Sequence, residues 1–255
     1  MKVSIGQRQM AYDSVGRGPA LVLLHAFPFD SRMWRQTAAA LAGQRQVITP
    51  DMRGFGLSDG GAGDFSIADL ADDVARLLDA LKLSAATVGG LSMGGYVALA
   101  FARHHRDRLK SLILADTKAA ADTPEARQGR QAAIELVESQ GVAALLEKQI
   151  PRLLAAAASE GLRAEVRALG AQPVDTVVAA IRALRDRPDR SAELPAITSP
   201  TLIVVGSEDA LSAPAEARSM AAAMPNARVV EIPGAGHLSN LENPDAFAAA
   251  LAGFV

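Results

Sequence analysis

Cysteine is absent from this chain of 255 residues. The absence excludes disulfide bonds, thiolate metal sites and a cysteine nucleophile. It also fits a reducing compartment, where disulfides are rare.

Neither sign of charge is in clear excess, because 26 lysines and arginines face 28 aspartates and glutamates, for a formal net charge of −2. This balance gives no reason to expect nucleic acid or an anionic membrane as a partner. No apolar run approaches the ~18 residues that span a bilayer. The N-terminus becomes polar within a few residues, and residues 1–8 lack the apolar block of a signal peptide. We therefore expect a soluble, cytoplasmic protein.

Apolar residues make up 49% of the chain, which is enough for one large domain with a full core. Short apolar runs alternate with segments of helical spacing, and this alternation predicts a parallel sheet covered by helices on both faces. A glycine-rich loop is expected over residues 54–63. The predicted strands span residues 2–7, 9–13, 20–24, 46–49, 87–91, 109–115, 201–205 and 228–232, and the predicted helices span residues 31–41, 67–81, 94–104, 214–224 and 245–254.

Residues 121–190 break this alternation. The segment is rich in alanine, leucine, arginine and glutamate, contains no convincing strand, and predicts several amphipathic helices. It is too rich in alanine to build much of a core by itself. We interpret 121–190 as a helical cap inserted into one core domain that is formed by residues 1–120 and 191–255.

One glycine-rich turn carries a candidate nucleophile. The string Gly90-Leu91-Ser92-Met93-Gly94 has Gly-x-Ser-x-Gly spacing and lies between a predicted strand and a predicted helix. A serine on so sharp a turn needs strained backbone angles and little bulk on either side, which glycine allows. The string matches neither the dinucleotide fingerprint nor the P-loop. The turn predicts Ser92 as a nucleophile; the alternative is a strand–helix turn with an incidental serine.

A serine hydroxyl needs a base that takes its proton. Of the four histidines, His104 and His105 fall at the end of a predicted helix, where positive side chains are favourable, so we assign them a structural role. His237 lies in the loop that follows the last predicted strand. The carboxyl ends of parallel strands are where such sheets bind ligands. His237 is therefore the predicted base, with a surface loop histidine as the alternative.

The base in turn needs an acid that orients the imidazole and stabilises its protonated form. Asp209 is the best candidate because it comes shortly after the predicted strand 201–205. Glu208 is its neighbour, and Asp116 directly follows the strand 109–115, so both remain alternatives. Position in a loop does not separate these three carboxylates.

Two backbone N–H groups are predicted to stabilise the negative oxygen that forms during the reaction. Met93 begins the helix after Ser92, and Phe27 lies in the loop after the strand 20–24. We expect His25 to fix this loop by hydrogen bonds, with a second base as its alternative role. Together with His25, we assign Ala26 and Leu91 to substrate contact or loop support.

Five motifs in order give the chain a resemblance to the α/β-hydrolase superfamily over nearly its whole length. The order Ser92, Asp209, His237 is also the order of triads in that fold. The resemblance implies an α/β-hydrolase fold with a mostly parallel eight-stranded sheet, helices on both faces and a small helical cap. The motifs are His-Ala-Phe-Pro at 25–28, Asp-Met-Arg-Gly-Phe-Gly-Leu-Ser at 51–58, and the segments 90–94, 206–209 and 234–237.

Two positions distinguish this chain within the superfamily. Ala26 stands where glycine is usual, and we expect its methyl group to shift the loop or narrow the acyl pocket. Ser92 stands where similar dehalogenases and epoxide hydrolases have aspartate, which disfavours those two chemistries.

The resemblance implies hydrolysis of small carboxylic esters through an acyl-enzyme intermediate, without metal or organic cofactor. A small-molecule ester or lactone is thus the expected partner, and the oligomeric state is left open. A lactonase of the 3-oxoadipate enol-lactonase type is the nearest alternative; carbon–carbon bond hydrolases, perhydrolases and hydroxynitrile lyases share the scaffold. A catalytically silent ligand-binding relative is the non-enzyme alternative. An intact set of Ser, Asp and His argues against it.

Arginines are frequent in the predicted cap, and two explanations fit them. They could recognise an acidic substrate, or they could lie on solvated helix faces, which is the interpretation we favour. The residues concerned are Arg152, Arg163, Arg167 and Arg182.

Overall fold

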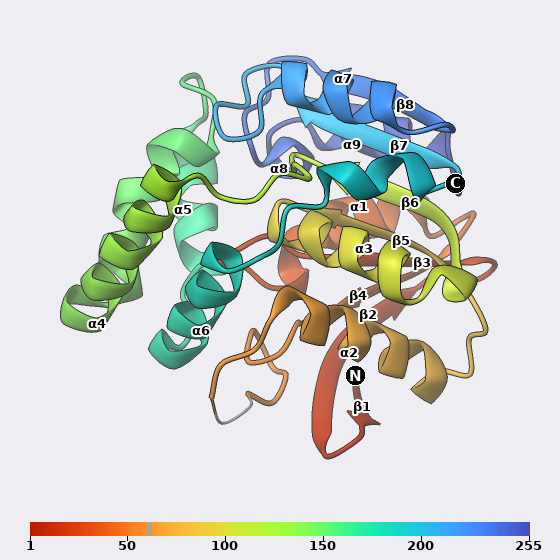
Figure 1. The fold of residues 1–255 in the computed structure, drawn as a ribbon, viewed down its shortest axis with the longest axis horizontal. Helices are drawn as coiled ribbons and strands as arrows, with labels where there is room; N and C mark the ends of the chain where they lie inside the picture. Colours follow the sequence, from red (N-terminus) through yellow and green to blue (C-terminus); the bar gives the residue numbers. More distant parts are fainter. Residues whose placement is uncertain (61–62) are drawn as a thin grey trace.

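The computed structural model describes residues 1–60 and 63–255, and within them eight strands form one sheet (Figure 1). Residues 61 and 62 of the predicted glycine-rich loop lie outside the described residues. The order across the sheet is β1-β2-β4-β3-β5-β6-β7-β8. The strands are β1 (Lys2–Ile5), β2 (Arg8–Val15), β3 (Ala20–Leu24), β4 (Gln46–Pro50), β5 (Ala86–Leu91), β6 (Leu109–Ala115), β7 (Thr201–Gly206) and β8 (Ala227–Ile232).

The sheet is mostly parallel, as predicted. β1 pairs with β2 and β2 with β4 in antiparallel fashion, whereas every pairing from β4 through β8 is parallel. β2 is longer than the predicted strand 9–13, because its second half, Tyr12–Val15, pairs with β4. The predicted fold class is confirmed.

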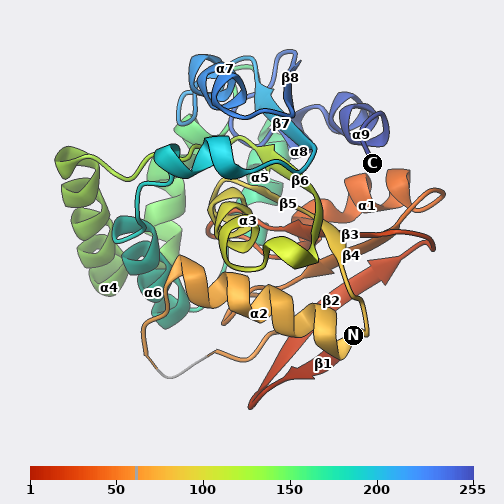
Figure 2. The same ribbon diagram turned by 45° about the vertical axis from the view of Figure 1, so that its right-hand side comes forward.

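Helices cover both faces of the sheet (Figure 2). The chain moves from β3 to β4 in one direction and from β4 through β8 in the other, and right-handed crossovers therefore place α1 on one face and α2, α3 and α7 on the other. α9 packs against α1. These helices are α1 (Arg35–Leu41), α2 (Ile67–Ala80), α3 (Met93–His104), α7 (Pro214–Ala223), the short α8 (Ser239–Glu242) and α9 (Pro244–Ala252).

Between β6 and β7 the chain leaves the sheet and forms α4 (Pro124–Leu153), α5 (Glu160–Leu169) and α6 (Val174–Arg185), which stand together at the left of Figure 1. No strand occurs in residues 121–190, all of which are described. α4 is interrupted at Gly141, where φ is 81° and ψ is 172°. We call residues 124–185 the helical segment.

Local signals explain several boundaries. Ser66 caps α2 as its hydroxyl accepts from the Asp69 N–H at 3.1 Å, while the Asp69 carboxylate accepts from the Ser66 N–H at 2.8 Å. The predicted helix 31–41 instead begins with a 3₁₀ turn, Ser31–Trp34, before α1. Asp30 favours this turn by accepting from the Arg32 N–H.

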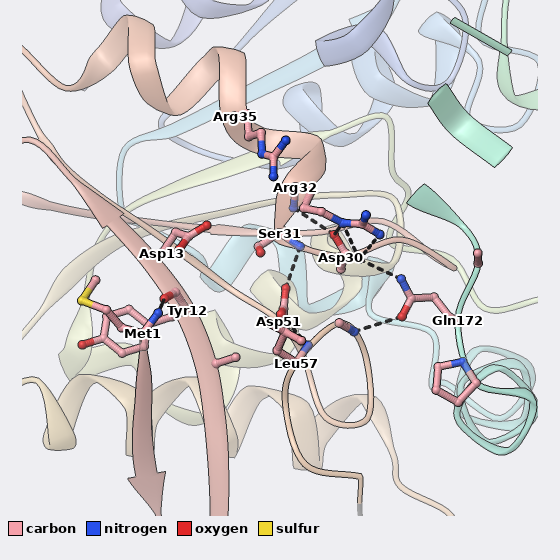
Figure 3. Close-up of a pocket in the computed structure, with 14 residues that line it drawn as sticks. Met1, Tyr12, Asp13, Asp30, Ser31, Arg32, Arg35, Asp51, Leu57 and Gln172 are labelled. Carbon is pink, nitrogen blue, oxygen red and sulfur yellow. Dashed lines mark hydrogen bonds and ion pairs between the residues drawn. The ribbon is translucent and has the colours of Figure 1, made fainter. Parts of the chain in front are cut away.

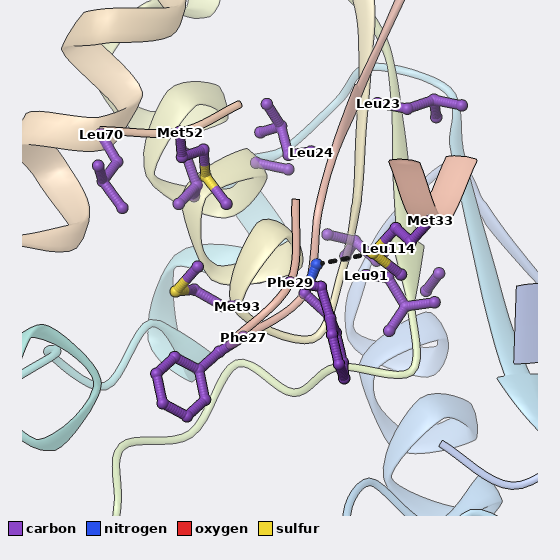
Figure 4. Close-up of a cluster of buried hydrophobic side chains, with 14 of the residues drawn as sticks. Leu23, Leu24, Phe27, Phe29, Met33, Met52, Leu70, Leu91, Met93 and Leu114 are labelled. Atoms are coloured by element: carbon purple, nitrogen blue, oxygen red, sulfur yellow. Dashed lines mark hydrogen bonds between the residues drawn. The ribbon is translucent and has the colours of Figure 1, made fainter. Parts of the chain in front are cut away.

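The core lies on both sides of the sheet. β3 and β5 are buried along their whole length, as continuous apolar runs predict for central parallel strands. Side chains from the ends of these strands and from the loop after β3 meet in one cluster, in which Leu24, Phe29 and Leu91 are fully buried (Figure 4). In the described residues, every helix is too short or too polar to cross a lipid bilayer.

Candidate active site

Ser92 occupies a strained turn between β5 and α3. Its φ of 54° and ψ of −111° lie outside the regions that L-residues normally adopt. Its N–H donates to the Ala115 carbonyl at 2.9 Å, and its carbonyl accepts from the Gly95 N–H at 2.9 Å and the Thr117 hydroxyl at 2.8 Å. These contacts hold the unfavourable conformation in place.

Two glycines allow the turn to be this tight. A Cβ on Gly90 would lie 2.2 Å from the carbonyl carbon and oxygen of Gly94. A Cβ on Gly94 would lie 2.2 Å from the Leu24 carbonyl oxygen and 2.9 Å from that of His25. Any side chain at either position would therefore collide with backbone atoms, and the start of α3 lies directly against the end of β3.

Three predicted site residues meet at the carboxyl edge of the sheet. The Ser92 hydroxyl oxygen lies 2.9 Å from Nε2 of His237. Nδ1 of the same ring lies 2.9 and 3.0 Å from the two carboxylate oxygens of Asp209. A proton can thus pass from the hydroxyl to one ring nitrogen while the carboxylate holds the other.

Asp209 is held as an anion by its surroundings. Burial alone would raise the pKa of its carboxyl, but hydrogen bonds from His237 and from the Leu211 and Ser212 N–H groups outweigh burial and lower the pKa. The Ser212 hydroxyl donates a further bond to Asp209 at 2.9 Å and lies 3.3 Å from Nδ1 of His237. The sequence reasoning missed Ser212, whose only sequence signal is its place three residues after Asp209.

The two alternative acids do not reach His237. Glu208 is exposed, and its N–H donates to the Ala235 carbonyl. Asp116 is fully buried and accepts from the Gly206 N–H at 2.7 Å and from the Ser239 hydroxyl. Burial, reinforced by the nearby charge of Asp209, raises the pKa of Asp116 well above its ordinary value. The hydrogen bonds from Gly206 and Ser239 lower the pKa by less than burial raises it. Asp116 joins the loop that carries Asp209 to the loop that carries His237.

His25 fixes the loop after β3. Its Nδ1 lies 3.0 Å from the Ala26 carbonyl, and its Nε2 accepts from the Met52 N–H at 2.9 Å. Burial lowers the pKa of this ring, which is therefore neutral with its proton on Nδ1. Both nitrogens are occupied, so His25 has none left for Ser92. Of the remaining histidines, His105 contacts Asp72 at 2.7 Å at the end of α3 and His104 is exposed.

The two predicted N–H donors lie in adjacent pieces of backbone. Phe27 lies in the loop after β3, which His25 holds in place. Met93 begins α3, and the start of α3 packs against the end of β3. Among the contacts of the described residues, neither N–H has an acceptor in the protein. Leu91 is fully buried in the core (Figure 4), and Ala26 is fully buried as well. Neither of them lines the cavity at Ser92.

A cavity of about 490 Å³ opens over Ser92 and His237. The sheet edge forms one wall, and side chains of α4 and α6 form the other. Its lining mixes apolar and charged groups, which are contributed by Phe27, Ser92, Tyr96, Lys118, Asp122, Glu125, Ala126, Gly129, Arg130, Ala133, Gln149, Arg152, Leu153, Leu184, Leu211, Ser212 and His237.

A second cavity, of about 570 Å³, is larger but does not include Ser92 or His237 (Figure 3). Asp30, Asp51 and Gln172 of its lining are hydrogen-bonded within the protein. Asp30 accepts from Arg32 and from Gln172, and Asp51 accepts from the Ser31 and Leu57 N–H groups. These bonds tie the loops after β3 and β4 to the chain before α6, which is a structural arrangement.

The sequence matches the profile of the alpha/beta hydrolase fold over residues 19–244. The chain belongs to this family. It is 32% identical over 241 residues to 3-oxoadipate enol-lactonase 1 of Acinetobacter baylyi, an alignment that covers 93% of this chain and 88% of the relative.

The structure of this chain is closely similar to two solved structures. A thermophilic esterase from Thermogutta terrifontis, with malate bound, has a TM-score of 0.95 at 38% identity, covering 99% of this chain and 96% of the esterase. The enol-lactonase from Burkholderia xenovorans has a TM-score of 0.92 at 30% identity, covering 100% and 99% of the two chains.

In this α/β-hydrolase the helical segment is joined to the loop of His237 by backbone bonds. The Leu153 carbonyl, at the end of α4, accepts from the His237 N–H at 3.0 Å and the Leu238 N–H at 3.2 Å. The half-buried Glu242 accepts from the Ala155 N–H at 2.7 Å and the Gly236 N–H at 2.9 Å. The sequence reasoning missed Glu242, because no motif includes it.

The four arginines singled out from the sequence have different environments. Arg163 donates to backbone carbonyls, Arg167 pairs with Glu147 and Glu160, and Arg182 pairs with Asp64. Only Arg152 of these four lines the cavity at Ser92. Among the described residues, no group of three or more His, Asp or Glu side chains is arranged to hold a metal ion.

Proposed function

We propose that this protein is a serine hydrolase that cleaves carboxylic esters of small molecules. The observation that carries the proposal is the contact of Ser92 with one nitrogen of His237 while Asp209 occupies the other. In this assignment Ser92 is the nucleophile, His237 is the general base and Asp209 orients the ring.

The reaction follows from these positions in two stages. The Ser92 oxygen attacks the ester carbonyl as His237 takes the hydroxyl proton, and the Phe27 and Met93 N–H groups stabilise the resulting oxyanion. The carbonyl re-forms, the bond to the alcohol breaks, and His237 gives its proton to the departing alcohol. A water molecule then attacks the acyl group as His237 takes its proton, and His237 returns that proton to the Ser92 oxygen as the bond to the acyl group breaks and the acid leaves.

We further propose that residues 121–190 act as a cap on a core domain formed by residues 1–120 and 191–255. Support comes from the cavity at Ser92, to which α4 contributes Arg152 and Leu153 and α6 contributes Leu184. Because these side chains belong to the helical segment, that segment selects the substrate while the sheet edge supplies the chemistry.

Lactone hydrolysis is the second candidate function. It is favoured by the similarity to 3-oxoadipate enol-lactonase 1, at 32% identity, and to the enol-lactonase structure, at a TM-score of 0.92. A lactone is an internal ester, so the same three residues and the same two stages would act on it.

The test compares wild type with Ser92→Ala on 4-nitrophenyl butyrate. We expect a loss of at least ~10⁴ in kcat/KM, because the variant cannot form the acyl-enzyme. Mass spectrometry of the wild type should show the acyl adduct on the peptide that contains Ser92. The exposed Ser139, in α4, gives the control variant Ser139→Ala, which should retain full activity. Equal rates for wild type and Ser92→Ala on esters and lactones would refute the proposal.

A further inference from the structure

Two cations without an acidic partner line the cavity at Ser92. Within the described residues, neither Lys118 nor Arg152 forms an ion pair or a side-chain hydrogen bond, although both line this cavity. Arg130, in the same wall, differs from them because it pairs with Asp122 at 3.0 Å. Lys118 and Arg152 are thus free to bind a negatively charged group that enters the cavity.

Lys118 is held near the nucleophile by the residue before it. The Thr117 hydroxyl donates to the Ser92 carbonyl at 2.8 Å, and Lys118 is half-buried at the next position. This hydrogen bond fixes the chain that follows β6 against the turn of Ser92, so Lys118 stands on the sheet side of the cavity.

Arg152 is held near His237 in a similar way. The next residue, Leu153, accepts the N–H groups of His237 and Leu238 through its carbonyl. Because these bonds join the end of α4 to the loop of the histidine, Arg152 stands on the opposite, helical side of the cavity. The two cations therefore flank Ser92 and His237.

The acidic residues of the cavity do not cancel this charge. The side chain of Asp122 is buried and pairs with Arg130 and with the buried Arg187, the latter at 2.8 Å. Glu125 lies at the exposed start of α4, where a backbone N–H and the Thr123 hydroxyl lower the pKa of its carboxyl. Positive side chains on the lining outnumber negative ones by one: among the described residues Lys118 and Arg152 have no ion-pair partner, and of the acidic residues only Glu125 has none.

We propose that the natural substrate is an ester or lactone that carries a free carboxylate at a distance from the bond that is cleaved, and that Lys118 and Arg152 bind this carboxylate. The inference rests on the proposed function. The Arg152 guanidinium can present two parallel N–H donors to a carboxylate, and the Lys118 ammonium adds a point charge. The apolar Phe27, Leu184 and Leu211 would contact the carbon chain between the two ends.

The experiment compares monomethyl and dimethyl esters of succinic, glutaric and adipic acids in a pH-stat at neutral pH. Each monoester carries the free carboxylate, and its diester carries a neutral group of similar shape. For the best chain length, wild type should favour the monoester in kcat/KM by about ten- to one-hundredfold, the range for hydrogen bonds to a charged group.

The variants Lys118→Gln and Arg152→Gln should each lower kcat/KM for the monoester several-fold more than for the diester, and the double variant should lose the preference. The matched control is Lys148→Gln, because Lys148 is an exposed cation of the same helix, four residues before Arg152, and does not line the cavity. The control should keep the preference of the wild type.

The outcomes separate this inference from the proposed function. If Ser92→Ala hydrolyses these esters as fast as wild type, the proposed function fails. If hydrolysis depends on Ser92 but monoester and diester react alike, only the inference is overturned. If no methyl ester is hydrolysed, the binding of glutarate or adipate is measured by the shift in melting temperature. Either dicarboxylate should raise the melting temperature of wild type but not of the double variant. Equal shifts in both proteins, or no shift in either, would overturn the inference.

Discussion

The carboxyl edge of the sheet and the helical segment 124–185 face each other across one cavity, but they are built differently. At the edge, backbone approaches backbone so closely that Gly94 leaves no room for a methyl group, and the carboxyl of Asp116 is fully enclosed. In the helical segment, exposed ion pairs such as Arg167 with Glu147 join neighbouring helices, and Gly129 has open space around it.

This difference separates two tasks. Catalytic groups must be held within a fraction of an ångström, so they belong on elements with enclosed, fully satisfied contacts. Exposed ion pairs contribute little to stability and can be exchanged with little loss. The helical segment can therefore vary the side chains that line the cavity without disturbing Ser92, Asp209 and His237.

The largest effect on activity is expected from a substitution at the carboxyl edge of the sheet. Asp209→Asn should lower kcat/KM on 4-nitrophenyl butyrate by about 10⁴, because the amide neither holds neutral His237 in the required tautomer nor stabilises its protonated form. Asp116→Asn should stay within about tenfold of wild type, since Asp116 contacts Gly206 and Ser239 and not the imidazole. The reverse result, with Asp116→Asn inactive and Asp209→Asn active, would exchange the roles of the two carboxyls.

Gly94→Ala should destabilise the protein by more than about 3 kcal/mol. The added methyl would lie 2.2 Å from the Leu24 carbonyl oxygen, and a backbone atom of a central strand cannot move aside as a flexible side chain can. This cost exceeds the gain of ~1 kcal/mol that alanine brings to a helix. Urea unfolding of wild type and variant measures the difference; a variant as stable as wild type would show that the edge is more adaptable than its contacts indicate.

Sequence reasoning located the strands well because buried parallel strands are continuous apolar runs. The run Ala20–Leu24 is buried at every position, as predicted. The turn at Ser92 was also predictable, because a turn this tight requires glycine at fixed spacing. Asp209 and Asp116 were harder to separate, since both follow strands that end at the same edge. What distinguishes them is which loop packs against each, and their partners are 28 and 123 residues distant in the chain.

The helical segment was predictable in kind but not in detail. Its amphipathic spacing indicated helices, whereas the partner of each arginine depends on packing. Arg182 pairs with Asp64, which is 118 residues away, while Arg152 has no such partner among the described residues.

The buried carboxyl of Asp116, at the carboxyl edge of the sheet, should also make the stability of the protein depend on pH. Burial raises the pKa of this carboxyl in the native state, whereas in the unfolded chain the carboxyl titrates near ~3.9. Below that pH both states are protonated and the contribution of Asp116 is fully present. As pH rises toward the native pKa, the unfolded chain releases its proton first, and the free energy of unfolding falls.

In Asp116→Asn this titration is absent. The stability of the variant relative to wild type should therefore increase above pH ~4, by at most about 1.4 kcal/mol per pH unit. Urea unfolding of both proteins between pH 4 and pH 8 gives the slope. A difference that does not change with pH would mean that Asp116 is ionised in the native protein.

The smallest expected effect lies in the helical segment and has the opposite sign to that at Gly94. Gly129→Ala should stabilise the protein by about 0.4–1 kcal/mol, because a methyl group meets nothing within 4 Å and alanine restricts the unfolded chain. Gly141, in the same helix, has equally open space but a φ of 81°, so Gly141→Ala should destabilise by about 1–3 kcal/mol. Thermal unfolding of both variants would distinguish the causes, since equal effects would mean that free space, and not backbone conformation, decides which glycines this segment can lose.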